Sequence, residues 1–301
     1  MRPIAIFRHA PADGPGAFSD FLHRRGWPQT LVRVDAGDPL PHDPRRFAGL
    51  AFMGGPMSVN DDLPWIEAEA ALIRTAVQAG IPVIGHCLGG QLMSKAFGGT
   101  VGRTPVKEIG WAEVTVHDNA VARAWFGDAA MLPAFHWHGE TFTIPPGATR
   151  VLSSAHCANQ GFAIGRHLGL QCHIEMDEGL VESWCRGGAG EIAESAGSPG
   201  VQSVDEIRRD MPARIDARDH VTIRVWERGA GLTLAGVALL FVWMNRNSSS
   251  PSKTGATGSS KEPELRANGE DRTKVAGRTE PKSWTETDTE LAIALANARI
   301  D

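Results

Sequence analysis

Residues 85–91 read GHCLGGQ and join an apolar run at residues 81–84 to a stretch with helical character. A cysteine, Cys87, therefore lies on a short glycine-flanked turn between a predicted strand and a predicted helix. The glycines permit a strained turn, and the positive N-terminal end of the following helix favours a thiolate. The turn has the mechanics of a nucleophile elbow with cysteine in the serine position. It requires a strand that delivers the cysteine to one edge of a sheet.

The first hundred residues alternate between short apolar runs and longer stretches. Four runs read as strands: residues 3–8, 30–35, 49–53 and 81–85. Residues 64–79 carry apolar side chains at helical spacing. This alternation predicts βαβ units and an α/β fold, an open, mostly parallel, flavodoxin-like sheet with helices on both faces. Ligand sites of such sheets lie beyond the carboxyl ends of the strands, where the loop at residues 54–56 and the Cys87 turn would meet.

The middle of the chain predicts further strands and then helices. The expected strands are residues 111–116 and 148–153, followed by a hairpin or meander of residues 162–164 and 168–172. Ser203 and Glu206 have the spacing of a capping box that opens a helix, and another element is expected near 216–228. We expect one compact domain over residues 1–230.

A thiolate nucleophile needs a base and a group that orients the base. His173 and Glu175 lie two residues apart after an apolar run, so both can point the same way from a strand end. Donors for an oxyanion are available from the backbone N–H of Leu88 and from the Gly54-Gly55-Pro56 turn. These residues make a cysteine-dependent hydrolase the leading hypothesis.

Four motifs in this order resemble the class I glutamine amidotransferase domain, in particular stand-alone members similar to the glutaminase half of GMP synthase. They are the loop GGP at residues 54–56, the elbow GHCLGGQ, WHGETF at 137–142 and QCHIE at 171–175. The resemblance covers residues 1 to about 190. It implies an amidotransferase-type sheet with a C-terminal extension.

The resemblance also implies roles for individual residues. Cys87 would attack the side-chain amide of glutamine and form a γ-glutamyl thioester. His173 would pass a proton to the departing ammonia, and Glu175 would orient His173. The oxyanion-hole N–H groups would come from Gly55 and Leu88.

Substrate contacts are implied in the same way, from Gln91 and from the backbone around Gly139 and Glu140. The family usually has QFHPE where this chain has QCHIE, so Cys172 and Ile174 stand in place of Phe and Pro. Both catalytic side chains are present. Ile174 does not fix φ as proline would, which leaves the rigidity of this loop in question.

The composition of the chain limits which classes of partner and cofactor can be expected. The chain has 301 residues, 42% of them hydrophobic, and a net charge of −5, which gives no electrostatic reason to expect nucleic acid. Its four cysteines form no CxxC pair, so neither a disulfide scaffold nor a zinc ribbon is predicted, and a cytoplasmic location fits best. His136 and His138 suggest a metal, but no helix-borne spacing supports one. We therefore expect no metal and no cofactor.

Several residues have ordinary explanations. Cys157, Cys172 and Cys185 are expected to be small core side chains. His86 is expected to be structural because adjacent residues on a turn diverge. The Glu140 carboxylate is expected to accept a loop hydrogen bond, and Lys107-Glu108 to be a solvated pair before the strand at residues 111–116.

The C-terminal part differs in kind. Residues 230–244 are mostly apolar and uncharged, yet fifteen residues reach only about 22 Å, short of the roughly 30 Å hydrocarbon core. We favour a buried or partner-covered helix in 231–244 over a membrane anchor or an interaction helix. Residues 245–288 resemble a disordered linker, and 289–301 a short helix.

Three functions follow. The first is a glutamine amidotransferase or glutaminase that releases ammonia for an acceptor; the chain contains no pyrophosphatase loop or Walker A motif, so a separate synthetase subunit or plain hydrolysis must follow. The second is a γ-glutamyl hydrolase acting on a γ-glutamyl amine or peptide. The third is a non-catalytic regulatory module, which the presence of Cys87, His173 and Glu175 disfavours.

Overall fold

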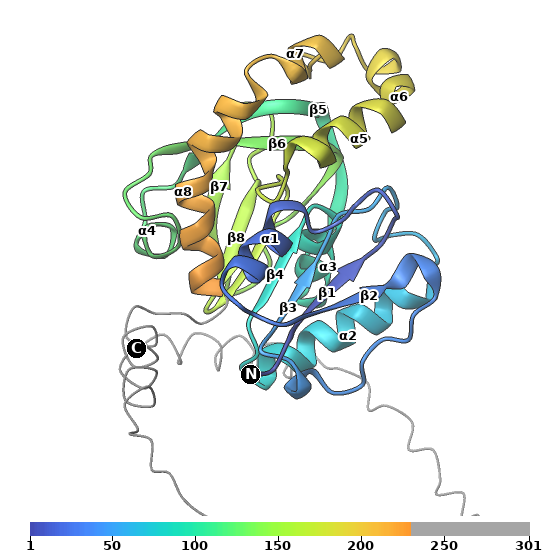
Figure 1. The fold of residues 1–301 in the computed structure, drawn as a ribbon, viewed down its shortest axis with the longest axis vertical. Helices are drawn as coiled ribbons and strands as arrows, with labels where there is room; N and C mark the ends of the chain where they lie inside the picture. The colour runs from blue at the N-terminus through green and yellow to red at the C-terminus, as the bar shows by residue number, and fades with distance from the viewer. Residues whose placement is uncertain (230–301) are drawn as a thin grey trace, which may run out of the picture. The chain divides into compact units, whose positions relative to one another are not determined.

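The structure is a computed structural model, and it describes residues 1–229. Within this range the chain forms one mixed sheet of ten strands flanked by helices (Figure 1). The strand order is β10-β5-β7-β8-β9-β4-β3-β1-β2, with β6 paired to β5 off this path. No helix among these residues is both long and apolar enough to cross a bilayer. The predicted segments 231–244, 245–288 and 289–301 lie outside the described residues and stay predictions.

Five adjacent strands form the parallel half of the sheet: β1 (Ile4–Arg8), β2 (Gln29–Arg33), β3 (Gly49–Phe52), β4 (Val83–His86) and β9 (His167–Leu170). Neighbours pair in the order β2-β1-β3-β4-β9, each in parallel register. The predicted open, mostly parallel sheet is confirmed. The first four predicted strands differ from the observed bounds by at most two residues at either end.

The other half of the sheet is mainly antiparallel: β5 (Val101–Val116), β6 (Met131–Phe142), β7 (Thr149–Ser153) and β8 (Gly161–Ile164), with the short β10 (Gly200–Val201) parallel to β5. The predicted hairpin is present as β8 and β9. Two expectations were incomplete. The strand expected at 111–116 begins ten residues earlier, at Val101, and β6 was not predicted.

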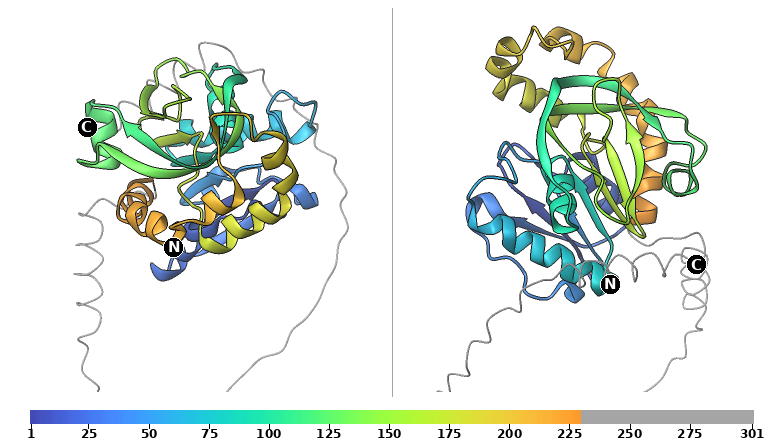
Figure 2. Two further views of the ribbon diagram at one scale, coloured as in Figure 1. Left: turned by 90° about the horizontal axis from the view of Figure 1, so that it is seen from above. Right: turned by 180° about the vertical axis from the view of Figure 1, so that it is seen from behind.

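Helices cover both faces of the parallel half. Alternate residues of a strand point to opposite faces, and β3 shows both environments. Ala51 shares an apolar cluster with Phe18 of α1 and Trp226 of α8, whereas Phe52 lies against Gly89 of α3. The helices involved are α1 (Gly16–Arg24), α2 (Pro64–Gln78), α3 (Leu88–Ala96) and α8 (Met211–Gly229), whereas α4 (Ala120–Phe126) packs on α8 and on β7 of the other half. The long α8 runs beside β6 in both the front and the back views (Figures 1 and 2).

A second apolar cluster lies between β5, β6 and three smaller helices at one end of the molecule (Figure 2). These helices are α5 (Glu178–Gly187), α6 (Ala189–Glu194) and α7 (Val204–Arg208); two short 3-10 turns, Val34–Ala36 and Pro44–Arg46, complete the described elements. The predicted capping box is present, because Ser203 and Glu206 bond reciprocally at the start of α7. This end of the molecule forms one wall of the cleft described below.

Candidate active site

Cys87 lies between the end of β4 and the first residue of α3, as the elbow predicts. Its backbone has φ 50° and ψ −107°, a combination that costs free energy for a residue with a side chain and that persists only where the surroundings enforce it. The Cys87 N–H donates to the carbonyl of Leu170 at 2.8 Å, which ties the turn to β9. The sulfur is thereby held at the carboxyl edge of the parallel strands.

The glycines of the elbow are required by close backbone packing. A Cβ on Gly89 would lie 2.2 Å from the Phe52 carbonyl oxygen, and one on Gly90 would lie 2.3 Å from that of Leu170. A Cβ on Gly85 would meet the backbone of Gly89 at 2.4 Å. Helix α3 therefore packs directly on β3, β4 and β9 because these three positions have no side chain, and the strained cysteine is held by that contact.

The His173–Glu175 pair is buried beside the elbow. The His173 Nδ1 lies 2.6 Å from Glu175 Oε1, and both residues are almost inaccessible to solvent. The backbone of His173 exchanges two hydrogen bonds with Phe135 of β6, at 2.8 and 3.1 Å. Ile174 is fully buried in the apolar core. The loop that lacks the usual proline is therefore fixed by a β-bridge and by the burial of Ile174.

The electrostatics of this pair are strongly perturbed. Burial alone would lower the pKa of His173, but the charge of the Glu175 carboxylate, its hydrogen bond and the nearby Cys87 sulfur raise it to about 10. Burial would likewise raise the pKa of Glu175, but the imidazoles of His86 and His173 outweigh this and hold it at about 2. Because burial lowers the pKa of His86 itself, the imidazolium facing Glu175 is that of His173. The site holds a protonated imidazole between a sulfur and a carboxylate.

The structure brings Cys87 and His173 together against one loop. A Cβ placed on Gly54 would lie 3.8 Å from Cys87 Cβ and 3.0 Å from His173 Cε1. The amide of Gln171 lies 3.5 Å from the sulfur, and the Trp137 carbonyl lies 3.9 Å from it. Cys87, His173 and Glu175, predicted from segments far apart in sequence, thus form one cluster.

Gly55 and Leu88 adjoin one another across the two converging loops. A Cβ on Gly55 would lie 2.7 Å from Leu88 Cδ2. Leu88 is the first residue of α3, where N–H groups have no intrahelical partner. The Gly54 side of the loop is held by His9, whose Nδ1 donates to the carbonyls of Met53 and Gly54 at 3.0 and 3.2 Å. The two loops that carry Gly55 and Leu88 are therefore in contact.

The remaining predicted residues line the same cleft. Gln91 is 4% exposed, and its amide lies 3.2 Å from Gln171 Oε1 and 3.5 Å from the Glu140 carbonyl. Glu140 accepts a hydrogen bond from Ser58 Oγ at 2.8 Å, as expected for a loop acceptor. Gly139 faces the Lys107 stem. These three predicted substrate-contact residues therefore all line the cleft.

The cleft has a volume of about 1180 Å³ and extends well beyond the cysteine. Its lining includes Cys87, His173 and Gly55. Trp137 of β6 and Trp184 of α5 also line it next to these residues, and their rings meet edge to face with centroids 5.8 Å apart. The lining continues along α5 and α6 to Glu194 and Ser195, so the cleft has room for a ligand that extends beyond the cysteine.

Three neighbours of this cluster, His9, Glu69 and Trp184, were not predicted from the sequence. Glu69 of α2 is completely buried and lies 3.0 Å from His9 Nε2. Burial alone would lower the pKa of His9, but the Glu69 carboxylate raises it above its usual value. Trp184 packs edge-on against His173 with centroids 4.8 Å apart. The sequence did contain a signal for Glu69, because a glutamate stands there among the apolar positions of the predicted helix. Trp184 lies in a segment that the sequence did not connect with the site.

The expectation of a solvated Lys107-Glu108 pair was wrong. Lys107 Nζ does reach Glu191 at 2.6 Å, but Glu108 is only 2% exposed. Both residues belong to β5, where neighbours point to opposite faces, so the carboxylate enters the interior. There it accepts hydrogen bonds from Ser154 and Gln160, each at 2.8 Å.

Comparisons with known proteins point to one family. The sequence pattern of the family described as glutamine amidotransferase class-I matches residues 20–182. The glutamine amidotransferase-like protein YfeJ of Salmonella typhimurium is 33% identical over 209 residues, covering 66% of this chain and 87% of that protein. A GMP synthase of Aeropyrum pernix is 34% identical over 172 residues, which cover 54% of this chain but only 32% of the synthase. The γ-glutamyl peptidase 3 of Arabidopsis thaliana is 28% identical, covering 49% of this chain and 62% of the peptidase.

Solved structures agree with this comparison. A glutamine amidotransferase from Methylobacillus flagellatus is 45% identical with a TM-score of 0.74, and the match covers 76% of this chain and 94% of that one. A glutamine amidotransferase from Thermotoga maritima is 26% identical with a TM-score of 0.67, covering 76% and 99%. Both similarities extend beyond the elbow to most of the described fold.

Proposed function

This chain belongs to the class-I glutamine amidotransferase family, and on that premise we propose that it hydrolyses the side-chain amide of glutamine through a thioester on Cys87 and releases ammonia. The support is the cluster of a strained cysteine with a buried imidazole–carboxylate pair beside a cleft. The same three groups, in this order of contact, are what thiol acyl transfer requires.

In the first half of the reaction, the Cys87 thiolate attacks Cδ of the substrate amide. The amide oxygen becomes an oxyanion that accepts hydrogen bonds from the N–H groups of Gly55 and Leu88. His173, protonated at the start, gives its Nε2 proton to the amide nitrogen as the C–N bond breaks. Ammonia leaves, the γ-glutamyl thioester remains, and His173 is neutral.

In the second half, water attacks the thioester carbonyl while His173 takes a proton from that water. The C–S bond breaks, glutamate leaves, and the thiolate–imidazolium pair is restored. Glu175 holds the imidazole with Nδ1 protonated throughout, since a carboxylate accepts from that nitrogen at 2.6 Å. Gln91, Gly139 and Glu140 are placed by this proposal at the amino-acid end of the substrate.

The test is ammonia release from glutamine by the full chain, compared with Cys87→Ser. The variant should lose at least about a thousandfold in kcat, because a serine hydroxyl is far less ionised than a thiol at neutral pH. Cys185→Ala is a matched control, since Cys185 is also buried but lies in the apolar cluster under α5. If Cys87→Ser keeps wild-type turnover, the proposal is wrong.

A second candidate is hydrolysis of a γ-glutamyl amine or peptide by the same chemistry. The size of the cleft favours it, because about 1180 Å³ exceeds the roughly 300–1,000 Å³ typical of small-molecule sites. A leaving group larger than ammonia could lie along Trp137 and Trp184. Comparing kcat/KM for glutamine and for γ-glutamyl conjugates decides between the two, since a larger value for glutamine rejects the second candidate. If glutamine is preferred, the ammonia acceptor would be held by a separate synthetase subunit or be water.

A further inference from the structure

A second group of buried, chemically active side chains lies behind the cleft, between β5 and β6. The side chains of Glu108, His136 and His138 are each at most 5% exposed, and one ligand atom from each lies within 4.8 Å of the others. Glu108 and His138 are direct partners in the β5–β6 register. His136 lies two residues before His138 on β6, so both rings enter from the same face.

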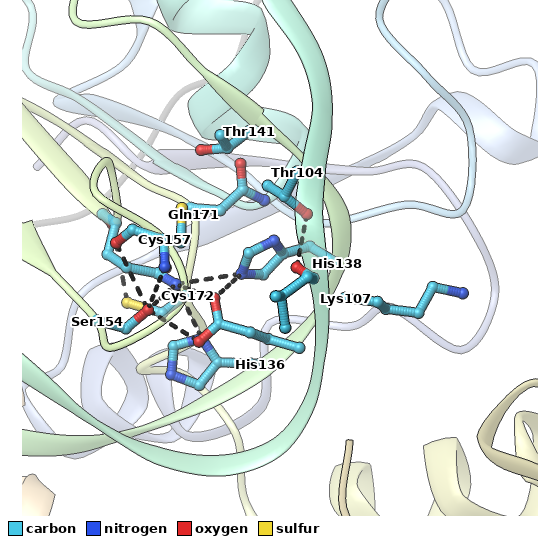
Figure 3. Close-up of polar contacts among 12 residues, drawn as sticks. Thr104, Lys107, His136, His138, Thr141, Ser154, Cys157, Gln171 and Cys172 are labelled. Carbon is cyan, nitrogen blue, oxygen red and sulfur yellow. Dashed lines mark hydrogen bonds and ion pairs between the residues drawn. The ribbon is translucent and has the colours of Figure 1, made fainter. Parts of the chain in front are cut away.

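The atoms of this cluster surround one point. Glu108 Oε2 lies 3.3 Å from His138 Nε2. The terminal nitrogen of Gln160 lies 2.8 Å from Glu108 Oε2, and 3.2 Å from both His136 Nδ1 and His138 Nε2. In Figure 3 the rings of His136 and His138 and the hydroxyl of Ser154 face this common region, while Lys107 points away.

The Gln160 amide cannot form hydrogen bonds with all the polar atoms around it. Its nitrogen has four close neighbours, counting Ser154 Oγ at 3.1 Å, but an amide has only two protons to donate. Its oxygen, Gln160 Oε1, is buried without a hydrogen-bond partner among the described residues. Such an oxygen normally finds a partner in a folded protein. A point surrounded by lone pairs and bordered by an orphaned amide oxygen is suited to a cation.

The tautomer of His138 supports this conclusion. Its Nδ1 lies 3.1 Å from the Glu140 carbonyl, which can only accept, so Nδ1 carries a proton. The nitrogen left to face the cluster is Nε2, which is the atom available as a metal ligand. A metal-binding histidine usually donates its other N–H in this way to a carbonyl or carboxylate.

We propose that Glu108, His136 and His138 bind a first-row transition dication, for which zinc is the best match. Zinc takes nitrogen and carboxylate ligands at about 2.0–2.1 Å, so tetrahedral ligand atoms lie about 3.3–3.4 Å apart. The contacts of 2.8 to 3.3 Å among His138 Nε2, Glu108 Oε2 and the Gln160 terminus are close to that spacing. Turning the Gln160 amide would exchange its nitrogen for Oε1 and supply the fourth ligand.

The position of the site indicates a structural role. It joins β5, β6 and Gln160, which directly precedes β8. His138 also lines the cleft, which provides an entry path for an ion. A bound ion would therefore fix the backbone at residues 138–140 from behind, without touching Cys87 or His173.

The test is metal binding by the tag-free full chain, because a histidine tag would itself bind metal. Metal content is measured as isolated, and chelator-depleted protein is then titrated with Co²⁺ and with Zn²⁺. The measurements are made in the Cys87→Ser variant as well, which removes the cleft thiol as a competing ligand. We expect about one metal per chain, visible absorption of tetrahedral Co²⁺ without sulfur-to-cobalt bands, and a higher Tm with Zn²⁺.

Variants assign the ligands. His136→Gln and Glu108→Gln should each weaken Co²⁺ binding at least about a hundredfold, whereas His117→Gln, outside the cluster, should leave it unchanged. Folded wild-type protein that neither retains nor binds metal would overturn the proposal and leave a hydrogen-bonded cluster only. Sulfur-to-cobalt absorption in Cys87→Ser would also overturn it, since Cys157 or Cys172 nearby would then be the ligand.

Discussion

Two buried clusters of the molecule contain the same pair of residue types, a histidine and a glutamate, in different surroundings. At the end of the parallel strands, His173 and Glu175 are 2.6 Å apart, with a cysteine and an open cleft beside them. Between β5 and β6, His138 and Glu108 are 3.3 Å apart, with a second histidine, an amide and a hydroxyl around them. An imidazole–carboxylate contact is therefore not by itself a mark of catalysis. The third group and its access to substrate decide the chemistry.

Replacing one histidine with glutamine in each cluster should give the largest difference in activity between the two clusters. His173→Gln should lower kcat for ammonia release by about 10²–10⁴-fold, because no base remains to carry the proton. His136→Gln should leave kcat within about tenfold of wild type and should mainly reduce stability. Steady-state turnover with near-ultraviolet circular dichroism checks both. Near-normal turnover in His173→Gln would remove that residue from the mechanism.

The elbow should also be less tolerant of added volume than the outer helices. Gly89→Ala should lower the free energy of unfolding by about 1–3 kcal/mol, since the new Cβ would lie 2.2 Å from the Phe52 carbonyl oxygen. Gly190→Ala in α6 is the matched control, because a Cβ there has nothing within 4 Å. Urea unfolding measures both. Equal stability in the two variants would contradict the close packing of α3.

The charged state of the His173–Glu175 pair predicts a pH window for its contribution to stability. The raised pKa of His173 contributes stability that is present below pH 6.5 and is lost as pH rises toward about 10. The lowered pKa of Glu175 contributes stability that is present above pH 4.5 and is lost as pH falls toward about 2. The contribution of the pair is thus greatest between 4.5 and 6.5.

Comparing wild type with Glu175→Gln tests this window. The difference in unfolding free energy should fall by more than about 1 kcal/mol between about pH 5.5 and about pH 9. Histidine NMR should show a lower His173 pKa in the variant. A difference that is constant with pH would mean that the pair is not charged as described.

The smallest effect is expected from a residue that acts through another. Glu69→Gln should reduce kcat/KM by about tenfold or less, because it weakens the hold of His9 on the Gly54 carbonyl without touching substrate. It should also lower the pKa of His9 in NMR titrations. Glu67→Gln is the control, since that carboxylate lies on the same helix with a side chain 72% exposed. Equal effects of the two changes would exclude a positioning role for Glu69.

The parallel half of the fold was predictable from sequence, and the antiparallel half was less so. Strands β1, β3 and β4 are short apolar runs buried on both faces, so local composition reveals them, whereas the edge strand β2 is mostly exposed. Strand β6 is interrupted by Pro133, Gly139 and Glu140, and its pairing depends on β5, whose partner residues lie between 16 and 41 positions earlier in the chain. The local sequence pattern of β6 therefore does not reveal its register with β5.

The same limit explains the two clusters. Cys87, His173 and Glu175 belong to compact motifs whose spacing indicates their chemistry. Glu108 becomes chemically meaningful only through its registration opposite His138. Helical spacing does not reveal His136 and His138 as a pair, because they lie on a strand, where residues two apart share a face.

The central claim is that the sulfur of residue 87, and no other, is the nucleophile. An electrophilic glutamine analogue, followed by peptide mass spectrometry, tests it directly because three other cysteines, Cys157, Cys172 and Cys185, are also buried and free in the same protein. The account predicts stoichiometric modification at Cys87, concurrent with loss of ammonia release and prevented by glutamine. Inactivation with the label on another cysteine, or full activity after complete labelling of Cys87, would contradict it.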